Sequence, residues 1–249
     1  MQDDLFGAGR AEPDERAPLA ARLRPARFEE MVGQEEVVRV LRELAQSGRL
    51  PSVVLWGPPG SGKTTLAFLL ARATGARLHS LSAVSAGVAD LRKVVAEARQ
   101  NRRIGRWTIL FIDELHRFNK AQQDAILPHV EDGTLTLIGA TTENPSFEVI
   151  SPLLSRSRVF RLEELTEEQL RQVVERGRAE LQVELSPEAA AGLLEGARGD
   201  ARVALNGLEV AATLAAGGRV ELTHVEQALQ ERHLLYDRAG DQHYDIVSA

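Results

Sequence analysis

The chain has 249 residues, of which 43% are hydrophobic and 27% charged, and its formal net charge is −6. This composition is typical of a globular protein with enough length for a buried core. No apolar run approaches the roughly 20 residues that span a bilayer, and the lack of cysteine excludes disulfides and thiolate metal sites. We therefore expect a cytoplasmic protein with no membrane partner. Any contact with nucleic acid must come from a local basic patch or from a ring of subunits.

The first two thirds of the chain alternate between β-rich and helical segments. Residues 1–18 are polar and predict a flexible N-terminal tail, and residues 19–50 are mainly helical in pattern. Strands are predicted at 53–56, 77–81, 108–112, 135–140 and 159–162, with helices at 63–73, 88–100 and 121–131. This alternation predicts an α/β domain over 19–164, with a parallel sheet covered by helices on both faces. Pro128 falls inside the third helix and is expected to kink or shorten it.

Strand patterns stop after residue 164. Helical segments follow at about 167–181, 187–197, 200–216 and 223–235, with a capping box at Thr166. We therefore expect a second, small all-helical lid domain over 165–237.

The segment behind the first strand has the pattern of a phosphate-binding loop. Its residues are Gly57, Pro58, Pro59, Gly60, Ser61, Gly62, Lys63 and Thr64, followed by Thr65. Glycines allow the backbone N–H groups to surround phosphate oxygens, and the helix that follows adds its positive dipole end. In this pattern Lys63 reaches the β- and γ-phosphates, and the Thr64 hydroxyl binds Mg²⁺. The segment therefore predicts a site for a nucleoside triphosphate with Mg²⁺.

Two later strands end in residues suited to hydrolysis. Asp113 and Glu114 follow a buried strand, so that Asp113 is placed to hold Mg²⁺ and Glu114 to polarise a water for attack. If the strand that ends at Thr142 lies between the other two, Thr142 reaches the γ-phosphate and orients that water. The segment 119–122 lacks the aspartate that reads guanine, which favours ATP.

Two arginines are candidates for binding the phosphates. Arg156 is expected to lie too far from its own phosphate loop, so it would serve the loop of a neighbouring subunit; a surface salt bridge is the alternative. Arg202 lies one turn into a helix of the lid, where it would link the ATP state to the domain angle. A solvated helix arginine is the alternative for that position.

Five motifs, in this order, resemble the RarA/MgsA family of AAA+ ATPases, the replication-associated recombination proteins. They are Pro18–Pro25, Val32–Gln34, Asp113–Lys120, Ile138–Phe147 and Gly199–Arg202, and the resemblance covers about residues 18–249. The family is related to the Werner-helicase-interacting ATPases and to clamp loaders.

The resemblance implies a role for each motif. Residues 57–64 would be Walker A, Asp113 and Glu114 Walker B, Thr142 sensor 1, and Arg202 sensor 2. Arg156 takes the position of the clamp-loader arginine finger, although Ser157 replaces the usual cysteine, and Val203 stands where a second sensor arginine is common. Val32 and Gly33 would lie against the adenine.

The resemblance also implies partners. Family members continue into a C-terminal domain that drives tetramer assembly, so we expect residues 238–249 to begin that domain and the chain to assemble weakly without it. Expected partners are DNA ends, forks and single-stranded regions, single-strand-binding protein and further copies of the chain.

Two short segments suggest more specific contacts. Gln2, Leu5 and Phe6 fit the bacterial pattern for binding the sliding clamp, with a disordered terminus as the alternative. Arg99, Arg102, Arg103 and Arg106 form the one concentrated basic segment, which is either a DNA contact or a solvated helix end.

The leading hypothesis is a DNA-dependent ATPase that remodels or unwinds DNA ends in replication-fork rescue. Three alternatives are a Holliday-junction branch-migration motor of the RuvB type, a clamp-loader subunit, and a nucleotide-dependent adaptor for the clamp or for single-strand-binding protein. A winged-helix module after the lid would distinguish the RuvB type, and the sequence shows no such module.

Overall fold

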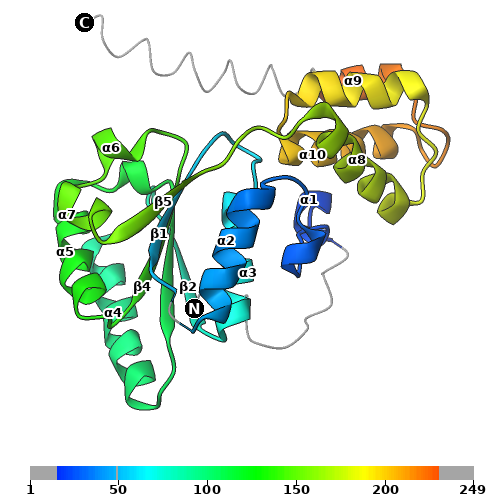
Figure 1. Ribbon diagram of the computed structural model, residues 1–249. Helices are drawn as coiled ribbons and strands as arrows, with labels where there is room; N and C mark the ends of the chain where they lie inside the picture. The colour runs from blue at the N-terminus through cyan, green and yellow to red at the C-terminus, as the bar shows by residue number, and fades with distance from the viewer. Residues whose placement is uncertain (1–15, 49, 230–249) are drawn as a thin grey trace, which may run out of the picture. The chain divides into compact units, whose positions relative to one another are not determined.

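The computed structural model describes residues 16–48 and 50–229 (Figure 1). These residues form two compact units. One is an α/β unit of Pro25–Leu170 with the short segment Arg198–Ala201, and the other is a helical unit made from the remaining described residues. No helix in the described part of the chain is both long and apolar enough to cross a bilayer.

Five parallel strands form the sheet of the α/β unit. They are β1 (Ser52–Trp56), β2 (Arg77–Ser82), β3 (Thr108–Asp113), β4 (Thr136–Thr141) and β5 (Ser157–Arg161), in the order β2-β3-β4-β1-β5. The order places β4 between β1 and β3, and every pair is parallel. The predicted α/β class is therefore confirmed. All strands end at one edge of the sheet, and we call this the carboxyl edge.

Helices cover both faces of the sheet (Figure 1). On one face, α2 (Glu35–Gln46) and α3 (Lys63–Thr74) pack buried leucines such as Leu41 and Leu66 against β1 and β3. On the other face, α4 (Val88–Arg103), α5 (Lys120–Glu131) and α7 (Ser151–Leu154) pack side chains such as Leu91 and Ile126. The short elements η1 (Phe28–Glu30), η2 (Leu115–Arg117) and α6 (Pro145–Glu148) lie in the connections.

Pro128 does not shorten α5, so the shortening that the sequence offered as one of two effects is wrong. The helix runs to Glu131, and the amide of Asp132 still donates to the carbonyl of Pro128 at 3.1 Å. Because Pro128 lies in the last turn, its missing N–H removes only one backbone hydrogen bond, and the packing of Ile126 holds the helix in place.

Gln123 of α5 joins its helix to two connecting segments of the chain. Its side chain is 2% exposed; its amide nitrogen donates to the carbonyls of Phe118 and Glu148, and its amide oxygen accepts from the amide of Ile150, all at 2.9 Å. These bonds hold the chain after β3 and the chain after β4 against α5. Gln123 therefore fixes the segment that leads from β4 to Arg156.

Gln123→Ala is expected to lower the free energy of unfolding by about 2–3 kcal/mol, because three backbone groups in buried or partly buried hydrogen bonds would be left without their partner. Urea unfolding followed by circular dichroism measures the effect. Gln100→Ala, on the exposed side of α4, is the matched control and is expected to change the free energy by less than about 0.5 kcal/mol. Equal effects of the two substitutions would contradict the assigned role.

The helical unit contains α1 (Leu19–Arg22), α9 (Pro187–Ala197), most of α8 (Glu167–Leu181) and of α10 (Ala201–Leu214), and a helical stretch over 222–229. Helix α1 packs within this unit, although the sequence assigned it to the α/β domain. The amide of Leu19 donates to the Glu209 carboxylate at 3.0 and 3.1 Å, and Arg22 forms an ion pair with Glu180 at 2.6 Å. These contacts explain why residues 16–24 join helices that follow them by more than 140 positions.

Candidate active site

The phosphate loop connects β1 to α3 at the carboxyl edge of the sheet. Gly60 and Gly62 have φ angles of +68° and +98°, in the left-handed region that favours glycine. A Cβ at Gly57 would collide with the backbone oxygen of Leu162. The loop therefore has a backbone form and a close approach that other residues do not permit.

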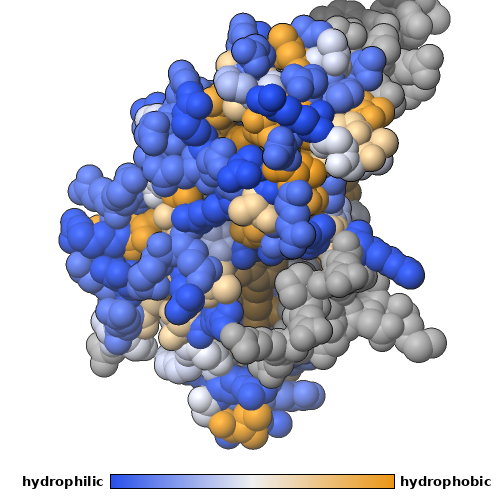
Figure 2. Space-filling model, turned by 90° about the vertical axis from the view of Figure 1, so that its right-hand side faces the viewer, coloured by the Kyte–Doolittle hydropathy of each residue, from blue (hydrophilic) through white to orange (hydrophobic). Residues whose placement is uncertain are grey.

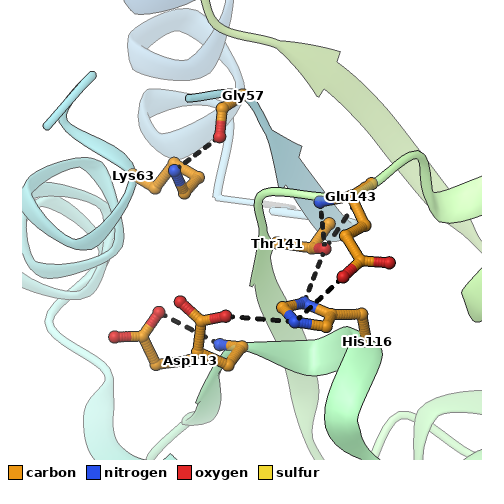
Figure 3. A network of polar contacts seen from close by, with 7 residues as sticks. Gly57, Lys63, Asp113, His116, Thr141 and Glu143 are labelled. Carbon is orange, nitrogen blue, oxygen red and sulfur yellow. Dashed lines mark hydrogen bonds and ion pairs between the residues drawn. The ribbon is translucent and has the colours of Figure 1, made fainter. Parts of the chain in front are cut away.

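Lys63 lies inside this loop and is only 8% exposed. Its Nζ atom donates a hydrogen bond of 2.7 Å to the carbonyl of Gly57 (Figure 3) and another of 2.7 Å to the carbonyl of Pro58. These two carbonyls hold the ammonium group inside the loop, where the pattern places it to bind phosphate oxygens. Thr64, which begins the same helix turn, is half-buried, and this donor set fits a triphosphate with its metal.

Asp113 and Glu114 lie at the same edge of the sheet, two strands away from the loop. Asp113 is the last residue of β3, and one of its carboxylate oxygens accepts a hydrogen bond from the amide of Glu114 at 3.1 Å. Glu114 has a φ of +56°, which a non-glycine residue rarely adopts. Such strain is common at functional sites, and here it turns the chain sharply after the strand.

His116 joins the end of β3 to the end of β4, a link that no sequence pattern predicted. Its Nε2 lies 3.2 Å from the Glu114 carboxylate and 3.7 Å from that of Glu143, while its Nδ1 lies 3.1 Å from the hydroxyl of Thr141. Figure 3 shows Thr141 and Glu143 together on one side of the ring, with dashed lines from the ring to both. The network connects the candidate base Glu114 to the next strand.

The structure places Thr141 in this network, whereas the sequence pointed to its neighbour Thr142. Thr141 is 1% exposed, and its hydroxyl accepts from the amide of Glu143 at 3.0 Å. Thr142 is the next residue, half-buried and outside the network of Figure 3. Every residue of β4 after Thr136 is buried, so an alternation of buried and exposed positions could not distinguish the two threonines.

The residues predicted to hold Mg²⁺ are Thr64 and Asp113. Among residues 16–48 and 50–229, no group of three or more histidine, aspartate or glutamate side chains is arranged to hold a metal alone. Mg²⁺ keeps several waters and is bound through one or two protein groups together with substrate phosphates. The two residues thus fit a metal that arrives with its nucleotide.

The segment predicted to lie against adenine is packed beside the phosphate loop. The Met31 methyl group occupies the space that a Cβ of Gly62 would need, and Gly33, with φ +73°, lies against Leu165. The side chain of Gln34 bonds both backbone groups of Glu163, at 2.7 and 3.1 Å. Val32 and Gly33 are thereby held close to the loop.

Asp200 is a second residue that the sequence did not single out. Its carboxylate lies against Gly60, where a Cβ would collide with it. It comes from the segment Arg198–Ala201, which belongs to the α/β unit although it is distant in sequence. Arg202 follows in the first turn of α10, within the helical unit.

Arg156 lies at the opposite edge of the sheet from the phosphate loop. It precedes β5, whose first residue Ser157 pairs with Ser52 at the start of β1, whereas the loop follows the end of β1. Its guanidinium forms a 2.6 Å ion pair with Glu131 and donates to the carbonyl of Pro152 at 2.8 Å. Both contacts hold the side chain at the surface.

The remaining predicted residues divide into two groups. Gln2, Leu5 and Phe6, with residues 238–249, lie outside the described part of the chain. The four basic candidates lie together at the end of α4 and in the turn that follows, and all four are exposed; they are Arg99, Arg102, Arg103 and Arg106.

Comparison with known proteins gives two matches to family models. The model of the ATPase family associated with various cellular activities (AAA) matches residues 53–167, and the model of an AAA C-terminal domain matches residues 178–249. The first covers the phosphate loop and the carboxylates, and the second covers most of the helical unit.

Several relatives match nearly the whole chain. An uncharacterised AAA domain-containing protein of Mycobacterium tuberculosis is 50% identical over 94% of this chain and 54% of its own length. Replication-associated recombination protein A of Escherichia coli is 47% identical over 93% of this chain and 55% of its own. ATPase WRNIP1 of Dictyostelium discoideum is 40% identical over 94% of this chain and 30% of its own.

Among solved structures, the RuvB Holliday junction branch migration motor of Thermotoga maritima is similar, with a TM-score of 0.69 and 30% identity over 84% of this chain and 72% of that one. The chain spans about half the length of the bacterial curated relatives named above. The motifs, the order of the strands and these similarities agree, and the chain belongs to the AAA+ ATPases of the replication-associated recombination protein A family.

Proposed function

We propose that this chain hydrolyses ATP to ADP and phosphate, and that DNA ends or forks stimulate the reaction. The observation that carries the proposal is the meeting of Lys63, Asp113 and Glu114 at one edge of the sheet. A buried lysine in a glycine loop binds phosphate, and a carboxylate pair opposite it supplies the metal ligand and the base. Membership of the AAA+ ATPases supports the same chemistry.

Each residue then has one role. Lys63 and the loop amides bind the phosphates, and Thr64 with Asp113 would hold Mg²⁺, which would supply positive charge to the phosphates. Glu114 accepts a proton from the attacking water, with His116 and the threonines at the end of β4 fixing its position. Arg156, at the far edge of the sheet, completes the site of a neighbouring copy, so activity depends on assembly.

The names of the relatives support DNA as the partner. One is a replication-associated recombination protein, and the structural neighbour is a Holliday junction branch migration motor. The name of the replication-associated recombination protein favours forks and ends as the DNA structure. The similarity to the branch migration motor gives a specific alternative, a motor on four-way junctions.

The turnover of ATP is expected to rise several-fold when DNA with a single-stranded end is added. A steady-state phosphate-release assay measures this with forked DNA, a four-way junction and closed circular duplex, the last being the control. Strongest stimulation by the junction would favour the alternative motor. Identical turnover with every DNA and without DNA would contradict the coupling to DNA.

A further inference from the structure

The turn between α4 and β3 combines positive charge with exposed apolar side chains. We call residues 99–107 the basic turn; it contains four arginines, and no carboxylate occurs between residues 98 and 112. Ile104 is 74% exposed and Trp107 is 62% exposed. Figure 2 shows hydrophobic surface bordered by hydrophilic surface at the lower end of the α/β unit, the end where this turn lies in Figure 1.

The backbone of the basic turn is fixed by hydrogen bonds. The amide of Arg106 donates to the carbonyl of Asn101 at 2.9 Å, and the amide of Gly105 donates to that of Arg102 at 3.1 Å. With Gly105 at φ +72°, these bonds form a Schellman motif that ends α4. The carbonyl of Trp107 also accepts from the amide of Arg77 of β2 at 2.8 Å. The exposure of the indole is therefore built into the fold.

The arginines of the basic turn are of two kinds. Arg102 donates to the carbonyl of Asp132 at 3.0 Å and so holds the turn against the end of α5. Within residues 16–48 and 50–229, no ion pair engages Arg99, Arg103 or Arg106. In a chain of net charge −6, three such arginines at one place favour an anionic ligand.

A groove continues the positive surface along α4. It has a volume of about 220 Å³ and lies between α4 and α5, with Arg92, Arg99 and His129 in its lining. Arg92 and Arg99 are seven residues apart, which places them on the same side of the helix, about two turns from each other. Arg99 belongs to both the groove and the basic turn, so the positive surface is continuous.

We infer that the basic turn binds single-stranded DNA, with Trp107 stacked on a base and with Arg99, Arg103 and Arg106 contacting phosphates. A partner must offer negative charge and flat apolar faces together, and unpaired bases on a phosphate backbone do so. A duplex keeps its bases stacked inside and offers only the charge. The inference rests on the proposed function only in taking DNA as the nucleic acid.

The surface is separate from the candidate active site. The basic turn precedes β3, whereas the phosphate loop and Glu114 follow the ends of β1 and β3 at the carboxyl edge. DNA binding here can therefore be measured without nucleotide and without turnover. This separation lets a failure of the inference be distinguished from a failure of the proposed function.

The experiment is a fluorescence titration of the protein with oligothymidylate in the absence of ATP. Stacking on a base is expected to quench Trp107, and Trp56 is the only other tryptophan. Trp107→Ala is expected to weaken binding about tenfold, measured by anisotropy of labelled DNA. Trp107→Phe, which keeps an aromatic face, is expected to retain most of the affinity and to abolish the quenching.

Phe147→Ala is the matched control, since Phe147 is an 84% exposed aromatic residue at α6, and it is expected to bind as the wild type does. The double variant Arg103→Ala with Arg106→Ala is expected to reduce the salt dependence of binding. The slope of log K against log salt falls by about 0.7 for each phosphate that the protein no longer neutralises.

Wild-type affinity in folded Trp107→Ala would overturn the inference. Tighter binding of blunt duplex or of oligouridylate would overturn the assignment to single-stranded DNA. Oligothymidylate binding at Trp107 without any DNA effect on ATPase turnover would leave the inference standing and refute the proposed function alone.

Discussion

Glu114→Gln is expected to lower kcat for ATP hydrolysis by about 10²–10⁴-fold while ATP binding is retained. Glutamine keeps the size of the side chain and can still bond His116, but it cannot accept a proton from water. Lys63 and Thr64, which bind the phosphates and the metal, are left unchanged. The substitution thus removes the step assigned to Glu114 and preserves the nucleotide complex.

Single-turnover hydrolysis and equilibrium binding of a fluorescent ATP analogue measure the two properties separately. Glu148→Gln is the matched control, because Glu148 is an exposed glutamate of α6 away from the network, and it is expected to turn over ATP at the wild-type rate. Unchanged turnover in Glu114→Gln would refute the role of Glu114 as base. Loss of ATP binding would instead show that the residue acts in holding the nucleotide.

The sequence predicted the parts of this site that depend on local pattern. The loop from Gly57 to Thr64 and the pair Asp113 and Glu114 each follow an apolar run, and each needs only neighbouring residues to be recognised. The role of the threonines after β4 requires that β4 lies between β1 and β3, and the strand order meets this requirement.

The sequence did not predict contacts that depend on how distant segments meet. His116 reaches Thr141, which is 25 positions away, only because β3 and β4 are neighbours in the sheet. Asp200 reaches Gly60 because one short segment folds with the α/β unit. Helix α1 packs with residues beyond 170, since Glu209 and Glu180 bind its first turn. In each case a side chain of common type acquires its role from topology.

Arg156→Ala is expected to lower kcat by about 10³-fold, because the arginine stabilises transition-state charge in the site of a neighbouring copy. Its own phosphate loop is out of reach. The register from Ser52 to Trp56 separates the two by the length of a strand, about 17 Å, and the Glu131 ion pair points the guanidinium to the surface. A residue with this placement acts on a second subunit or has no part in catalysis.

Mixing two inactive variants distinguishes these possibilities. Arg156→Ala retains Glu114, and Glu114→Gln retains Arg156, so a mixed assembly contains interfaces with both groups intact. With equal amounts mixed at random, about a quarter of the interfaces regain them, and turnover is expected to recover to that extent. Arg158→Ala is the control, since Arg158 is an exposed arginine two positions away on β5. An inactive mixture whose subunits demonstrably exchange would show that Arg156 does not act between copies, and the salt bridge to Glu131 would then be its whole role.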